Sequence, residues 1–120
     1  MLLVDNDRGV REALGCALQS FDYTVALASS EAEALNFLRD RDFDVAFFDL
    51  EMPLADGWET FAQIRNLKPL LPIILVTGRS DHRLRAVREE NIAVLEKPFD
   101  IPSLLEALDT IHAEKVKTHR

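Results

Sequence analysis

Polar side chains follow four of the short apolar runs in this sequence, at positions where a buried strand would end. They are Asp5 and Asn6 after residues 1–4, Asp49 after 44–48, Thr77 after 72–76, and Lys97 after 92–95. Carboxylate and amide oxygens suit a hard cation such as Mg²⁺, whereas a lysine and a hydroxyl suit an anion with several oxygens. Together these groups favour phosphoryl transfer, in which a carboxylate can itself be the nucleophile. Asp49, after the central run, is the natural candidate for that nucleophile.

The apolar runs alternate with amphipathic segments of helical period. We expect strands at residues 1–4, 23–28, 44–48, 72–76 and 92–95. We expect helices at residues 8–20, 30–39, 58–67 and 81–90, and a last helix that Asp100 caps. This alternation predicts an α/β fold, a doubly wound five-stranded parallel sheet covered by helices on both faces. Ligands of such sheets bind beyond the carboxyl ends of the strands, so the polar side chains should meet at one edge.

The first helix should bury one apolar stripe against the sheet. That stripe is formed by Val10, Leu14, Ala17, Leu18 and Phe21. On the second helix, Ser30 and Glu33 have the spacing of a capping box.

Each polar side chain also has a simpler, structural explanation. Asp7 can cap the first helix at least as well as it can bind a metal, and Asp56 with Gly57 favours a loop and helix start. Taken alone, Lys97 would be a surface lysine and Thr77 a hydroxyl at a strand end. The functional interpretation therefore rests on the arrival of these groups at one edge of the sheet.

Length and composition fit a single domain over residues 1–120, with 113–120 as a polar C-terminal tail. The 14 basic and 21 acidic residues give a net charge of −7, which argues against direct nucleic-acid binding. Cys16 is the sole cysteine, and the three histidines (82, 112 and 119) lack metal-ligand spacing and are interpreted as surface imidazoles. No apolar stretch is long enough to span a bilayer, so we expect a soluble, cytoplasmic domain with no membrane partner.

Four short stretches carry a resemblance to a known family. LLVDND, DLEMPLADGW, ILVTG and EKPF resemble, in order and at near-usual spacing, the signatures of the response-regulator receiver domain of two-component signalling. The resemblance covers essentially the whole chain. It implies a CheY-like, flavodoxin-like fold of three layers with sheet order 2-1-3-4-5.

The resemblance also implies roles for individual residues. Asp49 would accept a phosphoryl group from a sensor histidine kinase or a phosphotransfer protein, Thr77 would hydrogen-bond that group, and Lys97 would pair with its oxygens. Mg²⁺ would be held by Asp5, Asn6, Asp49 and the backbone carbonyl of Glu51. An effector domain or a dimer partner would receive the signal, and the VTG and EKPF stretches look nearest to receivers that control transcription factors.

The resemblance further implies a need for a small residue at Gly78 and a cis bond between Lys97 and Pro98. The sequence departs from the family pattern at two important positions. Asn6 replaces the second member of the acidic pair, and Val94 stands where an aromatic switch residue is usual, three positions before the lysine.

Three alternatives follow from these departures and from the fold. Asn6 and Val94 favour a degenerate receiver that binds proteins independently of phosphorylation, whereas the intact acceptor, hydroxyl and lysine oppose it. An aspartate-nucleophile phosphatase usually has a second Asp where this chain has Glu51, and a flavodoxin would need a phosphate loop rich in Ser, Thr and Gly after the first strand. We therefore expect a phosphoacceptor switch, with self-catalysed phosphoryl transfer and autodephosphorylation, rather than an enzyme acting on a separate metabolite.

Overall fold

The predicted alternation of strands and helices is present. The structure, a computed structural model, describes residues 1–52, 56–86 and 88–118, with side chains through residue 112. The strands are β1 (Leu2–Val4), β2 (Ala26–Ala28), β3 (Ala46–Asp49), β4 (Ile73–Thr77) and β5 (Ile92–Glu96). The helices are α1 (Arg8–Ser20), α2 (Glu31–Asp40), α3 (Gly57–Leu67), α4 (Ser80–Ala86) and α5 (Ile101–Thr118). In the described part of the chain, no helix is long and apolar enough to cross a membrane.

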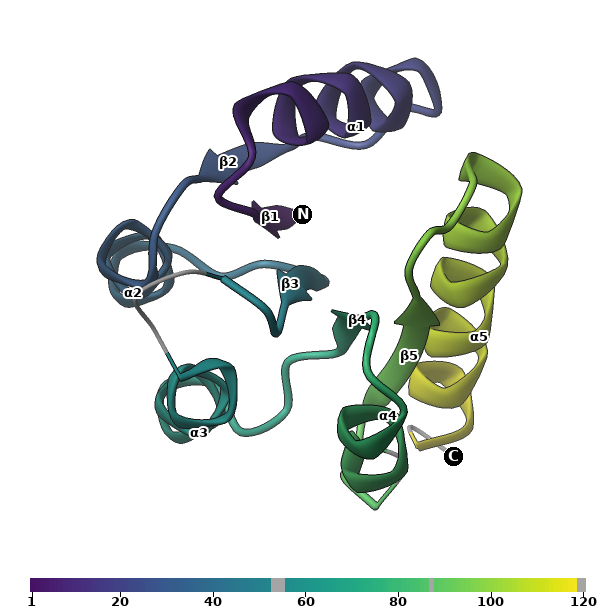
Figure 1. The fold of residues 1–120 in the computed structure, drawn as a ribbon. Coiled ribbons are helices and arrows are strands. Elements are labelled where there is room, and N and C mark those ends of the chain that lie inside the picture. The colour runs from purple at the N-terminus through teal and green to yellow at the C-terminus, as the bar shows by residue number, and fades with distance from the viewer. Residues whose placement is uncertain (53–55, 87, 119–120) are drawn as a thin grey trace.

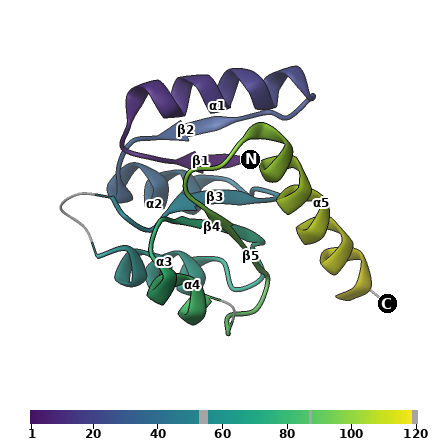
Figure 2. The ribbon, with the colours of Figure 1, turned by 45° about the vertical axis from the view of Figure 1, so that its right-hand side comes forward.

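The strands form one parallel sheet in the order β2-β1-β3-β4-β5. Figure 2 shows them following one another across the sheet. Helices α1 and α5 cover one face, and α2, α3 and α4 cover the other (Figure 1). This confirms the predicted doubly wound, three-layer fold. The direction of winding changes between β1 and β3, which is where such sheets form their ligand sites.

Alternate residues of each central strand enter the two opposite core layers. On β3, Phe48 packs with the layer under α2 and α3, while Phe47 packs with the layer under α1 and α5. On β4, Leu75 packs in the layer under α2 and α3, and Ile74 packs in the layer under α1 and α5. All four side chains are fully buried. Burial on both faces explains why these strands have continuous apolar sequences, and it leaves polar residues to the strand ends.

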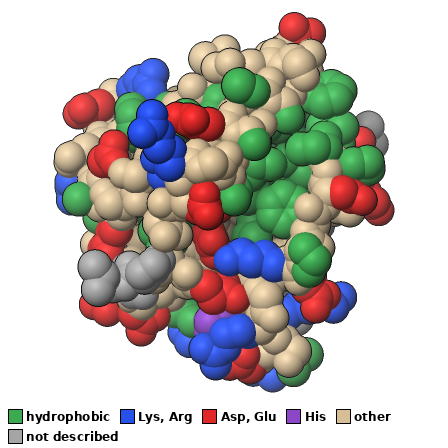
Figure 3. All heavy atoms as spheres, turned by 45° about the horizontal axis from the view of Figure 1, so that its top comes forward, with side chains coloured by type: hydrophobic (Ala, Val, Ile, Leu, Met, Phe, Trp, Pro, Cys, Tyr) green, Lys and Arg blue, Asp and Glu red, His purple; other side chains and the backbone are tan. Residues whose placement is uncertain are grey.

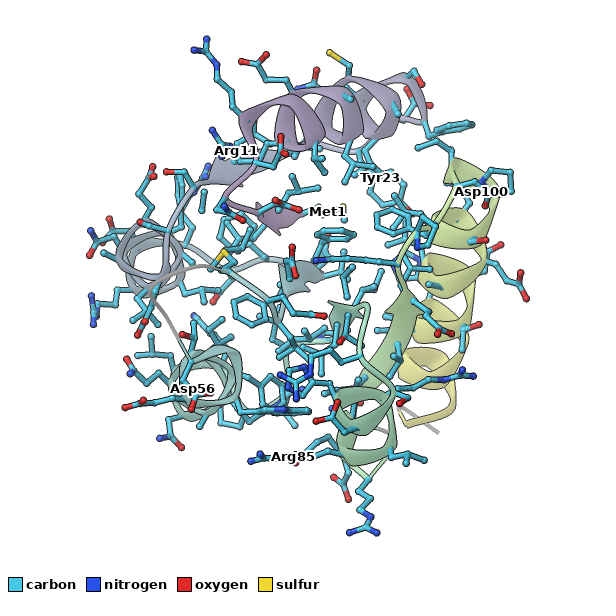
Figure 4. The ribbon with its side chains drawn as sticks, viewed as in Figure 1. Met1, Arg11, Tyr23, Asp56, Arg85 and Asp100 are labelled. Carbon is cyan, nitrogen blue, oxygen red and sulfur yellow. The ribbon has the colours of Figure 1, made fainter. Side chains whose placement is uncertain are left out.

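Helix caps confirm several predictions made from the sequence. The Asp7 carboxylate accepts a hydrogen bond from the Val10 amide at 3.1 Å, and the Asp100 carboxylate accepts one from the Ser103 amide at 2.9 Å. Asp56 caps α3 by accepting from two amides of its first turn, at 3.0 and 3.3 Å (Figure 4). Asp7 is thus a capping residue of α1.

The start of α3 lies against the end of β3 at close range. A Cβ atom on Gly57 would be only 2.0 Å from the carbonyl oxygen of Leu50. Glycine is therefore required here by the approach of two backbones. The contact fixes how the chain leaves the strand that ends in Asp49.

Two elements near the edge of the sheet differ from the prediction. Strand β2 covers 26–28 instead of 23–28, because its partner β1 begins at Leu2, which pairs with Ala26. Val10 and Phe21 are 38% and 50% exposed, although both were placed on the buried stripe of α1. Helix α1 buries Leu14, Gly15 and Leu18, so its contact with the sheet is narrower than the sequence pattern suggested.

Helices α4 and α5 also differ in length from the prediction. Helix α4 ends at Ala86, whereas a helix over 81–90 was expected; residue 87 lies outside the described residues. The segment has many arginines and, within α4, buries only Ala86. Helix α5 continues to Thr118, through most of the expected C-terminal tail, because residues 113–118 contain neither Gly nor Pro to stop it.

Candidate functional site

Asp49 is the last residue of β3 and is 4% exposed. The ammonium group of Lys97, which follows β5, lies 2.8 Å from Oδ1 and 2.9 Å from Oδ2. Oδ1 also accepts a hydrogen bond from the Glu51 amide at 2.9 Å. These partners offset the cost of burying a carboxylate, and the Lys97–Pro98 peptide bond is cis, as expected from the family resemblance.

Asp5 follows β1 and is 5% exposed. Its Oδ1 accepts from the Asp7 amide at 2.9 Å, and the Arg11 guanidinium donates to its backbone carbonyl at 2.8 Å (Figure 4). Burial raises the pKa of Asp5, with a smaller contribution from the negative charge of Asp49, while the Asp7 amide and Lys97 act in the opposite direction. Burial is thus the main reason why the charged form of Asp5 is disfavoured.

Thr77 ends β4 and is fully buried. Its hydroxyl donates to Oε1 of Glu51 at 3.0 Å and accepts from the Arg79 amide at 3.0 Å. The Gly78 amide donates to the same Glu51 oxygen at 2.6 Å. The two donors nearest the end of β4 are thus directed at Glu51.

The side chain of Glu51 is the largest addition to the site predicted from the sequence. It was expected to contribute only its backbone carbonyl, yet its carboxylate joins the ends of β3 and β4. The other oxygen, Oε2, is buried without a hydrogen-bond partner among the described residues. The position of Glu51, two residues after Asp49, indicated that the residue lies near the site. The direction of its side chain did not follow from sequence periodicity, because Glu51 lies beyond the end of the strand.

His82 is a second residue whose position the sequence did not reveal. Interpreted as a surface imidazole, it is instead half-buried, with Nδ1 3.4 Å from the Thr77 hydroxyl. Its ring lies edge-on to Trp58, 6.0 Å between centroids, and the Arg85 guanidinium lies 4.3 Å from the centre of the Trp58 ring. Helices α3 and α4 therefore meet beside the Thr77 hydroxyl.

A cleft of about 750 Å³ opens over these groups, between α1 and the segment that follows β5. Its lining includes both charged and apolar side chains. The lining residues are Asp5, Asn6, Asp7, Asp49, Glu51 and Lys97, with Val10, Ala13, Leu14, Pro98 and Phe99. Figure 3 shows acidic side chains beside a basic one, adjoining a broad hydrophobic area. The cleft brings together Asp5, Asn6, Asp49 and Lys97, as predicted.

Thr77 and Val94 lie outside the lining of this cleft. Thr77 reaches the site through Glu51, and half-buried Val94 packs against the core layer under α2 and α3. Asn6 is exposed at the rim. Within the described residues, no three His, Cys, Asp or Glu side chains group closely enough to hold a metal ion by themselves. A cation here would need amide, carbonyl or water oxygens beside the carboxylates.

Comparison with known proteins agrees with this arrangement. The family model described as the response regulator receiver domain matches residues 1–109. Transcriptional regulatory protein GlrR of Escherichia coli is 36% identical over 111 residues, which cover 91% of this chain and 25% of that protein. Response regulator MprA of a Mycobacterium species is 36% identical over 107 residues, covering 88% of this chain and 46% of that protein. The chain thus spans a quarter to a half of these relatives.

Solved structures give the same result. Chemotaxis protein CheY4 of Vibrio cholerae superposes with a TM-score of 0.82 at 27% identity, covering 92% of this chain and 95% of that one. The receiver domain of HemR from Leptospira biflexa has a TM-score of 0.82 at 29% identity, covering 92% and 90%. With the family model matched over most of its length, the chain belongs to the response regulator receiver domain family of two-component systems.

Proposed function

We propose that this domain accepts a phosphoryl group on Asp49 and relays its presence to a partner through a change of surface. The observation that carries the proposal is the state of Asp49 itself. Its carboxylate is 4% exposed, ends the central strand, borders the cleft, and is held by an ammonium group 2.8 Å away. A carboxylate held and directed in this way is suited to act as a nucleophile.

In the proposed reaction, an Asp49 oxygen attacks the phosphorus of a phosphohistidine on a sensor histidine kinase or phosphotransfer protein. An O–P bond forms while the N–P bond breaks, and the electron pair of the N–P bond stays on the imidazole nitrogen. Lys97 offsets the charge of the incoming group, and the Thr77 hydroxyl and Gly78 amide supply donors for its oxygens. Hydrolysis of the resulting aspartyl phosphate returns Asp49 to its starting state.

The donor set fits a Mg²⁺ ion beside the acceptor. Carboxylates of Asp5 and Asp49 would hold it, with the Asn6 amide oxygen and the Glu51 backbone carbonyl completing the protein ligands. Mg²⁺ commonly takes one or two protein carboxylates and keeps several waters. Burial of Asp5 beside Asp49 raises the pKa of Asp5, and a cation held between the two carboxylates would favour their charged forms. When bound, the ion neutralises charge on the phosphoryl oxygens.

The output would leave the site through α4. The Thr77 hydroxyl lies beside His82, which packs on Trp58, so a phosphoryl group that attracts this hydroxyl alters the contacts of α4. The short helix buries only Ala86 and is therefore poorly anchored. An effector domain or a dimer partner would recognise the change. The relative GlrR is named a transcriptional regulatory protein, which favours a role in the control of transcription through an effector domain.

A second candidate is a degenerate receiver that binds its partner independently of phosphorylation. Asn6 brings no charge to the proposed metal site, and Val94 offers no aromatic ring to change position. Transfer from a small phosphoryl donor separates the two candidates, because a degenerate receiver would not be modified.

The proposed function is tested by incubating the chain with acetyl phosphate and Mg²⁺ and measuring its intact mass. We expect the mass of one phosphoryl group on the wild type and none on Asp49→Asn. Hydrogen exchange on the same samples should change most at residues 78–86. Equal labelling of the Asn variant would show that Asp49 is not the acceptor, and an unlabelled wild type would favour the degenerate receiver.

A further inference from the structure

Glu51 holds both of the hydrogen-bond donors that a phosphoryl group on Asp49 would need. Its Oε1 accepts from the Thr77 hydroxyl at 3.0 Å and from the Gly78 amide at 2.6 Å. A hydroxyl and an amide each have one hydrogen to donate. Neither donor can therefore serve Glu51 and an incoming oxygen at full strength at the same time.

The Glu51 carboxylate is held on one side only. Its Oε2 is buried and has no hydrogen-bond partner among the described residues. The Lys97 ammonium, which is the nearby cation in the cleft, pairs with Asp49 instead. Leaving Oε2 without a hydrogen bond costs free energy. Glu51 is therefore held through Oε1 by two donors, while Oε2 makes no hydrogen bond within the described part of the chain that would fix the side chain in place.

Glu51 also has a route out of the position that it occupies. The residue is half-buried and lines the cleft, which is open to solvent. Gly78 leaves room beside it, since a Cβ there would stand 3.6 Å from the Glu51 oxygen and 3.7 Å from Lys97 Cβ. The side chain can thus turn into the cleft and be hydrated there when another acceptor takes its donors.

From these contacts we propose that the Glu51 carboxylate is a built-in competitor of the phosphoryl group. This inference rests on the proposed function of Asp49 and adds a regulatory role for a neighbouring side chain. In the unmodified protein, Glu51 occupies the Thr77 and Gly78 donors; phosphorylation succeeds when phosphoryl oxygens displace it. The carboxylate also adds like-charge repulsion toward the incoming anion. Glu51 therefore sets the threshold at which the domain becomes modified.

The competition predicts an order of affinities for beryllofluoride, an anion that binds carboxylates as a phosphoryl analogue. Glu51→Ala removes the competing carboxylate. The affinity of this variant for beryllofluoride with Mg²⁺ should be about tenfold or more above that of the wild type, since the two hydrogen bonds from Thr77 and Gly78 to a carboxylate are no longer lost on binding. Glu51→Gln keeps the shape and a neutral oxygen, which is a weaker acceptor. Its affinity should fall between those of the wild type and the alanine variant.

A matched control is Glu59→Ala, which removes one exposed carboxylate of α3 and changes the net charge equally. Its affinity for beryllofluoride should equal that of the wild type.

The Gly78 amide provides an independent readout by NMR. Without beryllofluoride its hydrogen should exchange faster in Glu51→Ala than in the wild type, and with saturating beryllofluoride the two proteins should be equally protected.

The outcomes separate this inference from the proposed function. If the wild type and the Glu51 variants are all phosphorylated on Asp49 but bind beryllofluoride equally, the competition is wrong and the acceptor stands. Weaker binding by Glu51→Ala would show that Glu51 instead holds the donors ready for the phosphoryl group. If no protein binds beryllofluoride or takes a phosphoryl group, the proposed function fails and the competition fails with it.

Discussion

Replacing Lys97 by methionine should destabilise the domain, because the buried Asp49 carboxylate loses its ion-pair partner. The size of the loss depends on how deeply the pair is buried. Pairs exposed at the surface contribute about 0.2–1 kcal/mol, whereas removing one partner of a fully buried pair costs about 3–5 kcal/mol. Here the Asp49 side chain is 5% exposed and that of Lys97 is 35% exposed. We therefore expect an intermediate coupling energy of about 1–3 kcal/mol.

The assay is a double-mutant cycle with Lys97→Met and Asp49→Asn, each measured by urea unfolding without divalent cations. Lys97→Met leaves a buried carboxylate beside Asp5, so it should lower the free energy of unfolding. In the Asp49→Asn background the same change should cost much less, because no buried charge is left behind. A coupling energy below about 0.5 kcal/mol, which is typical of an exposed pair, would show that burial does not strengthen the contact between Lys97 and Asp49.

The Arg83–Glu96 ion pair provides a control at similar distance and different burial. Its atoms are 3.0 Å apart, but the two side chains are 58% and 57% exposed. The corresponding cycle with alanine substitutions should give a coupling energy of about 0.5 kcal/mol or less. Equal coupling in the two pairs would show that burial does not determine the strength of the Lys97 contact.

Two further predictions concern backbone contact and metal binding. Gly57→Ala should lower the free energy of unfolding by about 2–3 kcal/mol, because the new Cβ would meet backbone atoms. Gly9→Ala, in the exposed first turn of α1, should instead raise the free energy of unfolding by about 0.5–1 kcal/mol. Urea unfolding measures both effects, and a smaller loss for Gly57→Ala than for Gly15→Ala would contradict the first. Asn6→Asp should tighten Mg²⁺ binding about tenfold by adding a charged ligand, and should destabilise the metal-free protein by repulsion between carboxylates. Calorimetric titration and urea unfolding test the two effects, and an unchanged Mg²⁺ affinity would mean that Asn6 is not a ligand.

The sequence was sufficient to predict the sheet and the meeting of Asp5, Asp49 and Lys97. Strands buried on both faces have continuous apolar sequences, and parallel strands bring their carboxyl ends to one edge. Residues placed just after such strands must therefore approach one another, whatever the details of the loops. Individual roles, such as phosphoryl acceptor for Asp49, came from the family resemblance instead.

The contacts that the sequence did not predict lie beyond strand ends or at the sheet edge. The side chain of Glu51 follows a turn, where the alternation of a strand no longer determines its direction. His82 reaches Thr77 because α4 begins at Ser80, close to the end of β4. The hydrophobic periodicity of a sequence does not predict how close a helix begins to the end of the preceding strand. Val10 was expected to be buried, but how much of a helical stripe is covered depends on the width of the sheet beneath it.

Phosphorylation of Asp49 is tested most directly by locating the phosphoryl group on the modified wild-type chain. The chain is exposed to acetyl phosphate and Mg²⁺, digested under mildly acidic conditions that preserve acyl phosphates, and mapped by mass spectrometry. We expect one phosphoryl group, in the peptide that contains Asp49, and its loss on treatment with hydroxylamine, which cleaves acyl phosphates. A phosphoryl group on any other residue, or one that withstands hydroxylamine, would contradict this expectation.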